Sequence, residues 1–449
     1  MTMPPSDQTA RGPSGQGAIT TERQPAPPGL FGQLSSRRVR LFAVLALIGP
    51  GIITANADND AGGISTYSVA GASYGYSLLW MLVLITFSLA VTQEMGARMG
   101  AATGKGLAAL IRENFGVRWT LFAMVATLIA NLATTVAEFA GIAAASELLG
   151  MPRWISVPLA ALLVWLLVAR WSYRSVEKVF LVLSAVYIAY PLSGIVVGAP
   201  WGEVLRQTVT PTFQLNAGYI LVFIATVGTT ITPWGQFFIQ AYVVDKGIGP
   251  KQYPATRADV LVGAFVTDIV SFFIIVATGS TLHVRGIQVT DAAQAALALE
   301  PLAGPLARYL FAIGLANASL LAASILPLAT SYTICEAFGW ELGVDQSWRD
   351  APAFHGLYAF SIAFGALVAL IPGLPLMPVM LLSQDVNGVL LAVVLVFALK
   401  LANNKQIMGS MANGRVGNTI AWATTVAMIL LTVLLIGSSL APLVGVNLG

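Results

Sequence analysis

Long apolar runs separated by short polar connections dominate the chain. About eleven runs are long enough to cross a bilayer as α-helices, because roughly 20 apolar residues span its hydrocarbon core. We predict these spans at residues 41–66, 75–102, 118–148, 154–170, 176–199, 217–245, 257–281, 303–334, 354–372, 376–400 and 417–445. The longest connection, residues 281–302, is expected to be an external loop with a short helix. The pattern predicts an all-α polytopic membrane protein.

Composition supports this class and excludes others. Only 10% of the 449 residues are charged and 57% are hydrophobic, whereas soluble proteins carry about 25% charged residues. We find no nucleophile–base pair, phosphate-binding glycine loop or cofactor motif, so we expect neither an enzyme, nor a cofactor, nor a nucleic-acid partner. Residues 1–38 are rich in Pro, Gly and Ser and are predicted to form a disordered cytoplasmic tail, followed by one transporter domain at 39–449.

The basic residues predict how the chain lies in the membrane. A cytoplasmic N-terminus places all but four of the 23 Lys and Arg residues on the cytoplasmic side. The four exceptions are Arg153, Arg206, Arg285 and Arg308. By the positive-inside rule the N-terminus is cytoplasmic and, after eleven spans, the C-terminus lies outside. We expect a multi-pass protein of the cell membrane, the inner membrane of a prokaryote, working in the lipid bilayer as a monomer or weak oligomer.

Two apolar runs are interrupted by Gly or Pro and by polar residues at mid-depth. They are GPGIITANADNDAGG at 49–63 and VGTTITPWGQ at 227–236. They lie five spans apart, which gives the second half of the chain the opposite topology. Interrupted helices in matching positions indicate an inverted-repeat transporter with a central binding site. We assign the repeats to residues 41–199 and 217–400 and an extra helix to 417–445.

The first interrupted run carries two aspartates, Asp58 and Asp60, inside a predicted span. A carboxylate buried in a membrane costs at least several kcal/mol unless it is paired or binds a cation. An unwound helix also leaves backbone carbonyls free, which is tolerated only beside a cavity or a ligand. Carboxylate and carbonyl oxygens together favour half of a cation site. The alternative is a polar kink that neighbouring helices satisfy.

These segments resemble the Nramp family of divalent metal transporters. Further matches are RMGAATGKGLAALIRENFG at 98–116, the pair Ser383 and Gln384, and NNKQIMG at 403–409. The resemblance covers nearly all eleven spans. It implies the LeuT-type fold, an inverted repeat of five plus five helices in which helices 1 and 6 are broken, with an eleventh helix added.

The resemblance also implies the metal ligands. The family's Asp-Pro-Gly-Asn motif reads Asp60-Ala61-Gly62-Gly63 here, and its Ala-x-x-Met-Pro-His motif begins at Thr229 with Thr232 in place of the methionine. The implied metal site consists of Asp60, Gly63, Thr229, Thr232 and Gln384. The spacing of Thr229 and Thr232 predicts that both lie on one helix face.

Residues that the family associates with protons are mostly replaced. Trp234 and Ile239 stand where the resemblance implies histidines, and Thr135 stands where it implies an aspartate. Glu138 remains as a possible residual proton or gate residue. The two histidines of this chain fall outside the span interiors in our assignment. Proton coupling is therefore weakened, although Glu138 can still titrate.

A second tier of polar residues lies within or next to the spans. Each either faces the hydrophilic cavity around the ion or satisfies a neighbouring helix. These residues are Asp58, Asn59, Gln236, Asp268, Asp385 and Asn387. Thr226, Thr229, Thr230 and Thr232 cluster in the second interrupted run, and at least two of them are expected to bond their own helix backbone instead.

The replacements relative to the family motifs favour a hard ion. A thioether selects transition metals, whereas threonine offers a hard oxygen. Losing the methionine and asparagine side chains also enlarges the site, which suits partly hydrated Mg²⁺, and Mn²⁺ has similar ligand preferences. We predict an alternating-access importer of Mg²⁺ and also Mn²⁺ without strict proton coupling. The alternative is a proton-coupled manganese or iron transporter with a divergent motif.

Overall fold

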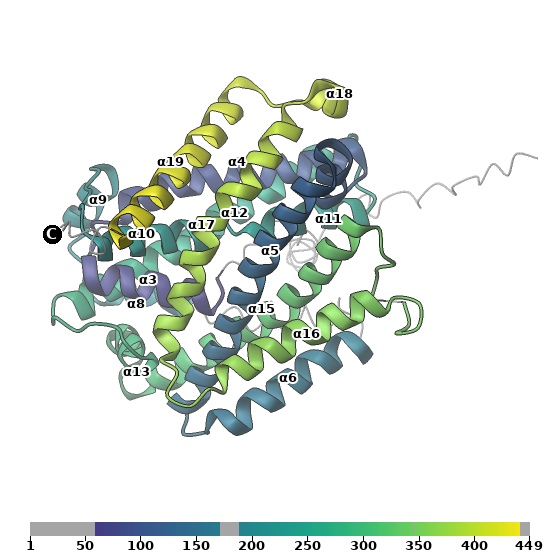
Figure 1. Ribbon diagram of the computed structural model, residues 1–449. Helices are drawn as coiled ribbons and strands as arrows, with labels where there is room; N and C mark the ends of the chain where they lie inside the picture. Colours follow the sequence, from purple (N-terminus) through teal and green to yellow (C-terminus); the bar gives the residue numbers. More distant parts are fainter. Residues whose placement is uncertain (1–58, 171–187, 345, 441–449) are drawn as a thin grey trace, which may run out of the picture. The chain divides into compact units, whose positions relative to one another are not determined.

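The computed structural model describes residues 59–170, 188–344 and 346–440. All regular structure in these ranges is helical (Figure 1). Eight helical stretches among the described residues are long and apolar enough to cross a membrane, and α6 is a shorter apolar helix. The predicted all-α class is confirmed. Much of the first and fifth expected spans lies outside the described residues, so the number of eleven stays a prediction.

The helices of the first repeat follow the predicted apolar runs. They are α3 (Ala61–Tyr74), α4 (Leu79–Thr103), α5 (Leu107–Leu148), α6 (Arg153–Arg170) and α8 (Ala189–Val196). α3 begins immediately after Asp60 and continues beyond the expected end at residue 66. α8 is the last part of the expected fifth span.

The second repeat contains the broken helix that the sequence predicts. Its helices are α10 (Ala217–Thr230), α11 (Pro233–Asp245), α12 (Tyr253–Thr278), α15 (Ala307–Phe338), α16 (Pro352–Ala369) and α17 (Leu376–Ala402). One turn of π-helix, Gly279–His283, continues α12. The extra helix is α19 (Arg415–Leu440).

Two helical segments differ from the prediction. α5 begins at Leu107 rather than near residue 118, because a short helix joins the span at a kink where Gly116 has a φ of 77°. α9 (Trp201–Val209) was not expected, since its nine residues are too short and too polar to register as an apolar run. The predicted external loop does contain short helices, among them α13 (Ala292–Ala296).

α5 is central to the packing, with its most extensive contacts to α15 and α17 (Figure 1). α17 also crosses α10 at very short range. A Cβ atom at Gly228 would lie 2.1 Å from the carbonyl oxygen of Gln384, and one at Gly388 would lie 2.6 Å from that of Ile224. Small residues allow such close approach of membrane helices. The crossing places the end of α10 against the middle of α17.

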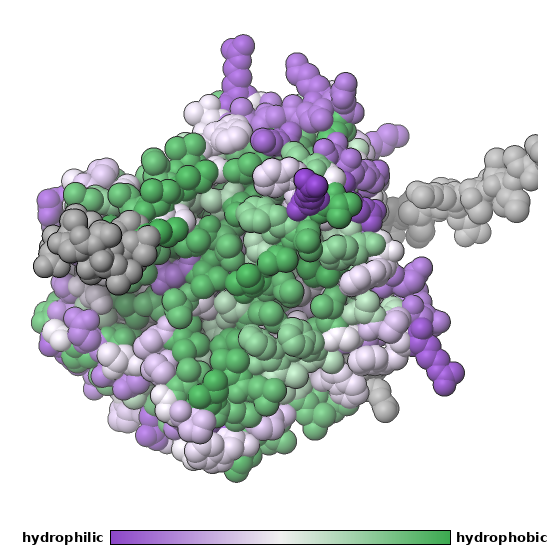
Figure 2. Space-filling view, viewed as in Figure 1, coloured by the Kyte–Doolittle hydropathy of each residue, from purple (hydrophilic) through white to green (hydrophobic). Residues whose placement is uncertain are grey.

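The outer surface is apolar where helices face the surroundings. Figure 2 shows a broad hydrophobic area across the middle of one face, with hydrophilic side chains gathered toward its margins. α5 contributes the exposed side chains of Leu121, Phe122, Val125 and Ile129. Exposed apolar area of this extent indicates contact with lipid rather than water.

The crossing of α10 and α17 predicts a sharp intolerance to an added methyl group. We expect Gly228→Ala to destabilise the protein by at least about 1–3 kcal/mol, because the clashing partners are backbone atoms that move only with their helices. Thermal unfolding followed by size-exclusion chromatography measures this. Gly202→Ala in α9 is the matched control, since its Cβ atom would meet nothing within 4 Å. Equal melting temperatures for the two variants would contradict the assigned crossing.

Candidate metal-binding site

Asp60 lies at the start of α3, in the first of the two interrupted apolar runs. It is the N-cap of α3, and its Oδ1 accepts a hydrogen bond from the Gly63 backbone N–H at 2.6 Å. The other carboxylate oxygen, Oδ2, is buried without a hydrogen-bond donor among the described residues. One oxygen thus orders the helix start and the other is available to an ion. Gly63 contributes this N–H.

Glu138 of α5 lies against the same helix start. Its Oε2 accepts a hydrogen bond from the Ala61 backbone N–H at 3.3 Å, and its carboxyl group is next to that of Asp60. Both side chains are fully buried. The N-terminal end of α3 carries partial positive charge, which favours carboxylates there. The first turn of α3 therefore brings together two acidic groups from distant parts of the chain.

The second broken helix opens between Thr230 and Pro233. Proline disfavours helical geometry at the preceding residue, Thr232, which instead caps α11: its hydroxyl accepts a hydrogen bond from the Gly235 N–H at 3.2 Å. The N–H of Ile231 bonds back to the carbonyl of Val227. The carbonyls that follow at the end of α10 have no intrahelical donor. The break thus supplies backbone oxygens beside a threonine hydroxyl.

The four threonines of this segment differ in the hydrogen bonds that their hydroxyl groups make. Thr226 and Thr230 donate to the carbonyls of Val222 and Thr226, so they satisfy their own helix as expected for at least two of the four. Thr229 is fully buried and its hydroxyl has no partner among the described residues. The expectation that Thr229 and Thr232 share one helix face is wrong, because the helix ends between them. They lie on opposite sides of the break.

Gln384 of α17 joins the two breaks. Its side-chain amide covers Gly62, where a Cβ atom would lie 1.8 Å from Nε2, and its backbone carbonyl touches Gly228 of α10. A hydrogen bond of 2.7 Å between the Tyr67 and Thr230 hydroxyls also ties α3 to α10. Gln384 therefore lies against Gly62, two residues after Asp60, and against Gly228, which directly precedes Thr229.

Asn387 fixes the orientation of Gln384. Its Nδ2 donates to Gln384 Oε1 at 2.9 Å and to the Thr134 hydroxyl of α5 at 2.8 Å. Gln384 Nε2 in turn lies 3.0 Å from the Ser383 hydroxyl. The oxygen of Gln384 faces Asn387 here, so its use as a metal ligand requires a rotation of the side chain. Asn387 thus holds the Gln384 side chain in this orientation.

The remaining second-tier residues that the structure describes are all buried. Asn59 directly precedes Asp60 and is buried, and Gln236 is buried in the first turn of α11 with an unpartnered Nε2. Asp268 of α12 is buried, and neither of its carboxylate oxygens has a hydrogen-bond partner among the described residues. Asp385 is buried on α17. Asp58 lies outside the described residues.

Residues expected to lack a proton function are tightly packed. Trp234 and Ile239 are buried, and the Thr135 hydroxyl donates to the carbonyl of Asn131 at 2.7 Å. The two histidines are in structural contacts: a His283 ring nitrogen lies 2.9 Å from the Ala72 carbonyl, and one of His355 lies 2.9 Å from that of Gln346. Among the described residues, no three His, Cys, Asp or Glu side chains gather to hold a metal.

Sequence reasoning missed three residues close to the site. The Ser65 hydroxyl, one turn into α3, donates to the Ala61 carbonyl at 2.6 Å and lies 3.4 Å from the Met380 sulfur and 3.6 Å from that of Met377. Met377, Met380 and Gln384 recur at the spacing of one helix face. That spacing was a usable signal, but an apolar methionine within an apolar run does not stand out.

The helix break between Thr230 and Pro233, beside the buried start of α3, lies in a fold of the LeuT type. A manganese transporter from Eremococcus coleocola has the same fold, with a TM-score of 0.70 over 93% of this chain and 91% of that chain at 21% identity. MhsT, solved in complex with L-phenylalanine, is similar with a TM-score of 0.54 over 86% of this chain and 98% of that chain at 15% identity.

The family model described as natural resistance-associated macrophage protein-like matches residues 51–438, so the chain belongs to the Nramp family. A divalent metal cation transporter MntH from Klebsiella pneumoniae is 29% identical over 416 residues, covering 90% of this chain and 97% of its own length. MntH from Bacillus subtilis is 25% identical over 410 residues. The protein is accordingly a divalent metal transporter and not an enzyme.

The two oxygens of Asp60 predict that its structural and metal-binding roles can be separated. Asn caps helices as well as Asp does, whereas Ala loses about 1 kcal/mol. We expect Asp60→Asn to fold with nearly unchanged stability but to bind Mn²⁺ at least about tenfold more weakly, since the charge is lost. Isothermal titration calorimetry and thermal unfolding measure the two effects. Wild-type Mn²⁺ affinity in Asp60→Asn would show that Asp60 only caps the helix.

Proposed function

We propose that the protein imports Mg²⁺, and also Mn²⁺, by alternating access through a partly hydrated site between the two helix breaks. The observation that carries this proposal is the buried, donor-free Oδ2 of Asp60, held at a helix start that Gln384 connects to the end of α10. A bound cation would offset the cost of burying such an oxygen in a membrane protein.

The donor chemistry favours a hard ion. Besides Asp60, the break in the second repeat offers the hydroxyls of Thr229 and Thr232 and the last carbonyls of α10. All of these are oxygens, which suit Mg²⁺ and Mn²⁺ rather than thiophilic metals. Gly63 and Thr232 are also smaller than the residues that the family resemblance implies there. The extra volume accommodates water molecules that Mg²⁺ releases reluctantly.

The surroundings also favour transport without strict proton coupling. A coupled path requires titratable groups in sequence, and Trp234, Ile239 and Thr135 cannot supply them. The membrane potential alone suffices as a driving force, since two charges crossing 100 mV gain about 4.6 kcal/mol. The positive-inside distribution of Lys and Arg supports a cytoplasmic N-terminus, and hence uptake toward the negative side. All proposed ligands come from one chain, in keeping with a monomer.

Glu138 supports one competing proposal. It is the remaining acidic group beside Asp60, and as a proton acceptor it would make the protein a proton-coupled manganese or iron transporter. The two proposals differ in whether protons enter the lumen together with the metal. They therefore separate in a single transport assay.

Uptake into proteoliposomes is the decisive measurement. With a potential that is negative inside, we expect Mg²⁺ entry reported by a trapped dye, without lumenal acidification, and loss of entry in Asp60→Asn. Mn²⁺ should compete with Mg²⁺. Mn²⁺ entry accompanied by protons, with no Mg²⁺ entry, would overturn the proposal and favour the coupled alternative. Asp350→Asn in an exposed loop is the control for loss of one acidic charge.

A second prediction concerns Thr232. Its replacement by methionine introduces a soft thioether and fills space that hydration water needs. We expect Thr232→Met to lower Mg²⁺ uptake at least about tenfold relative to Mn²⁺ and to admit Cd²⁺. Thr226→Met is the matched control within α10, since the Thr226 hydroxyl bonds only its own helix. An unchanged ratio of Mg²⁺ to Mn²⁺ uptake would remove Thr232 from the selectivity determinants.

A further inference from the structure

A polar cleft of about 430 Å³ opens beside the C-terminal half of α4. None of the proposed metal ligands lines it. It is bounded by α4, by the first turns of α12 and by the start of α19. Its lining residues are Glu94, Arg98, Tyr253, Arg257, Gly414, Arg415, Val416 and Gly417. The distribution of basic residues assigns this end of the helices to the cytoplasmic side. The metal site does not account for this concentration of arginines.

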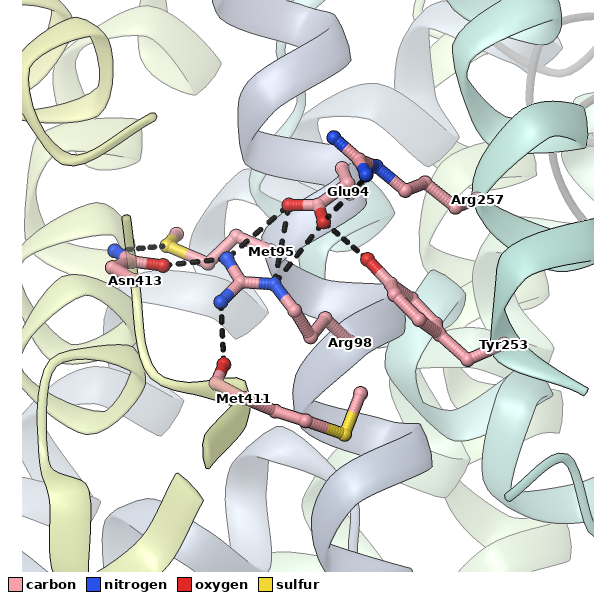
Figure 3. A network of polar contacts seen from close by, with 7 residues as sticks. All are labelled: Glu94, Met95, Arg98, Tyr253, Arg257, Met411 and Asn413. Atoms are coloured by element: carbon pink, nitrogen blue, oxygen red, sulfur yellow. Dashed lines mark hydrogen bonds and ion pairs between the residues drawn. The ribbon is translucent and has the colours of Figure 1, made fainter. Parts of the chain in front are cut away.

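The floor of the cleft is a closed polar network, shown in Figure 3. Arg98 donates to Glu94 Oε1 at 3.1 Å, to the Met411 carbonyl at 2.6 Å and to Asn413 Oδ1 at 2.6 Å. The Tyr253 hydroxyl donates to the same Glu94 carboxylate. The side chains of Glu94 and Arg98 are only 15% and 12% exposed. Glu94 is thus neutralised by its neighbours and does not repel an anion at the cleft mouth.

The cleft keeps a net positive charge at its rim, because the single carboxylate of Glu94 faces three arginines. Arg257 lies 3.7 Å from Glu94, but its side chain is 59% exposed. Arg415 is exposed and has no acidic partner among the described residues. These two guanidinium groups come from different helices, α12 and α19. Arginine binds phosphate through paired hydrogen bonds, and the N-terminal end of α19 adds favourable partial charge.

An apolar surface adjoins this basic rim. Leu84 and Phe87 of α4 are exposed by 56% and 50%, and Phe87 contacts the exposed ring of Phe265 on α12. Phe87 precedes Glu94 by two helical turns, or about 10 Å along the axis. Val416 at the start of α19 is also exposed. The surface therefore offers cationic groups at the membrane boundary and hydrocarbon contacts deeper in the bilayer.

We propose that this cleft binds the phosphate group of an anionic phospholipid, with its acyl chains along Leu84 and Phe87. Basic recesses between helices on the cytoplasmic side are suited to such headgroups. The lipid bridges Arg257 of α12 and Arg415 of α19 across the end of α4. A free phosphate ion would satisfy the arginines but not the adjoining apolar surface.

Native mass spectrometry of the full chain tests the proposal. We expect wild-type protein to retain phosphatidylglycerol but not phosphatidylcholine with the same acyl chains. Phosphatidylglycerol adducts should fall at least fivefold in the double variant Arg257→Gln, Arg415→Gln. They should stay unchanged in Arg118→Gln, which replaces an exposed arginine of α5 on the same side of the membrane. The single variant Arg415→Gln should give a smaller loss, and it removes no ion pair of the described structure.

Two outcomes would overturn this assignment. Equal phosphatidylglycerol binding by the wild type and the double variant would show that the arginines do not select the lipid. Inorganic phosphate that raises the melting temperature as much as phosphatidylglycerol does would assign the cleft to the free ion. The readout requires no metal transport, so its failure is independent of the proposed function.

Discussion

The structure depends on placing a carboxylate where water is absent. Burying Asp60 in a membrane protein costs several kcal/mol unless other groups offset its charge. The described helices supply two of those groups through the N–H of Gly63 and the positive end of α3. The start of a helix at Asp60 leaves these N–H groups free for this purpose. A continuous helix would have its N–H groups engaged internally and could not cap an aspartate at mid-depth.

The neighbouring helices follow from that constraint. A helix break is tolerated only if packed protein surrounds it, and α17 meets this need by approaching both α3 and α10. Gly228 and Gly388 allow the close crossing, while Gln384 covers Gly62. Asn387 and Thr134 then anchor α17 to α5. The two breaks are held together by one helix, so a change in the position of α17 alters both halves of the site.

Apolar length and Pro233 were enough to predict the spans that the structure describes and the second break. These are local properties, because each depends on residues that are consecutive in the sequence. The links from Gln384 to Asn387, from Ser65 to Met380 and from Arg98 to Asn413 were not predictable, because each joins residues that only the tertiary fold brings together. The early start of α5 was missed for a different reason: the polar residues Arg112, Glu113 and Asn114 and the kink at Gly116 separate its first turn from the apolar run.

Charge balance links the retained Glu138 to the proposed ion. Two adjacent carboxyl groups in a low-dielectric site cannot both be ionised without a counter-charge. If the proposed divalent ion binds at Asp60, its charge offsets both carboxylates, and without the ion a shared proton can do so. Trp234, Ile239 and Thr135 offer no titratable group to pass such a proton on. The Asp60–Glu138 pair is therefore the place at which the proposed uncoupled importer and its proton-coupled alternative differ.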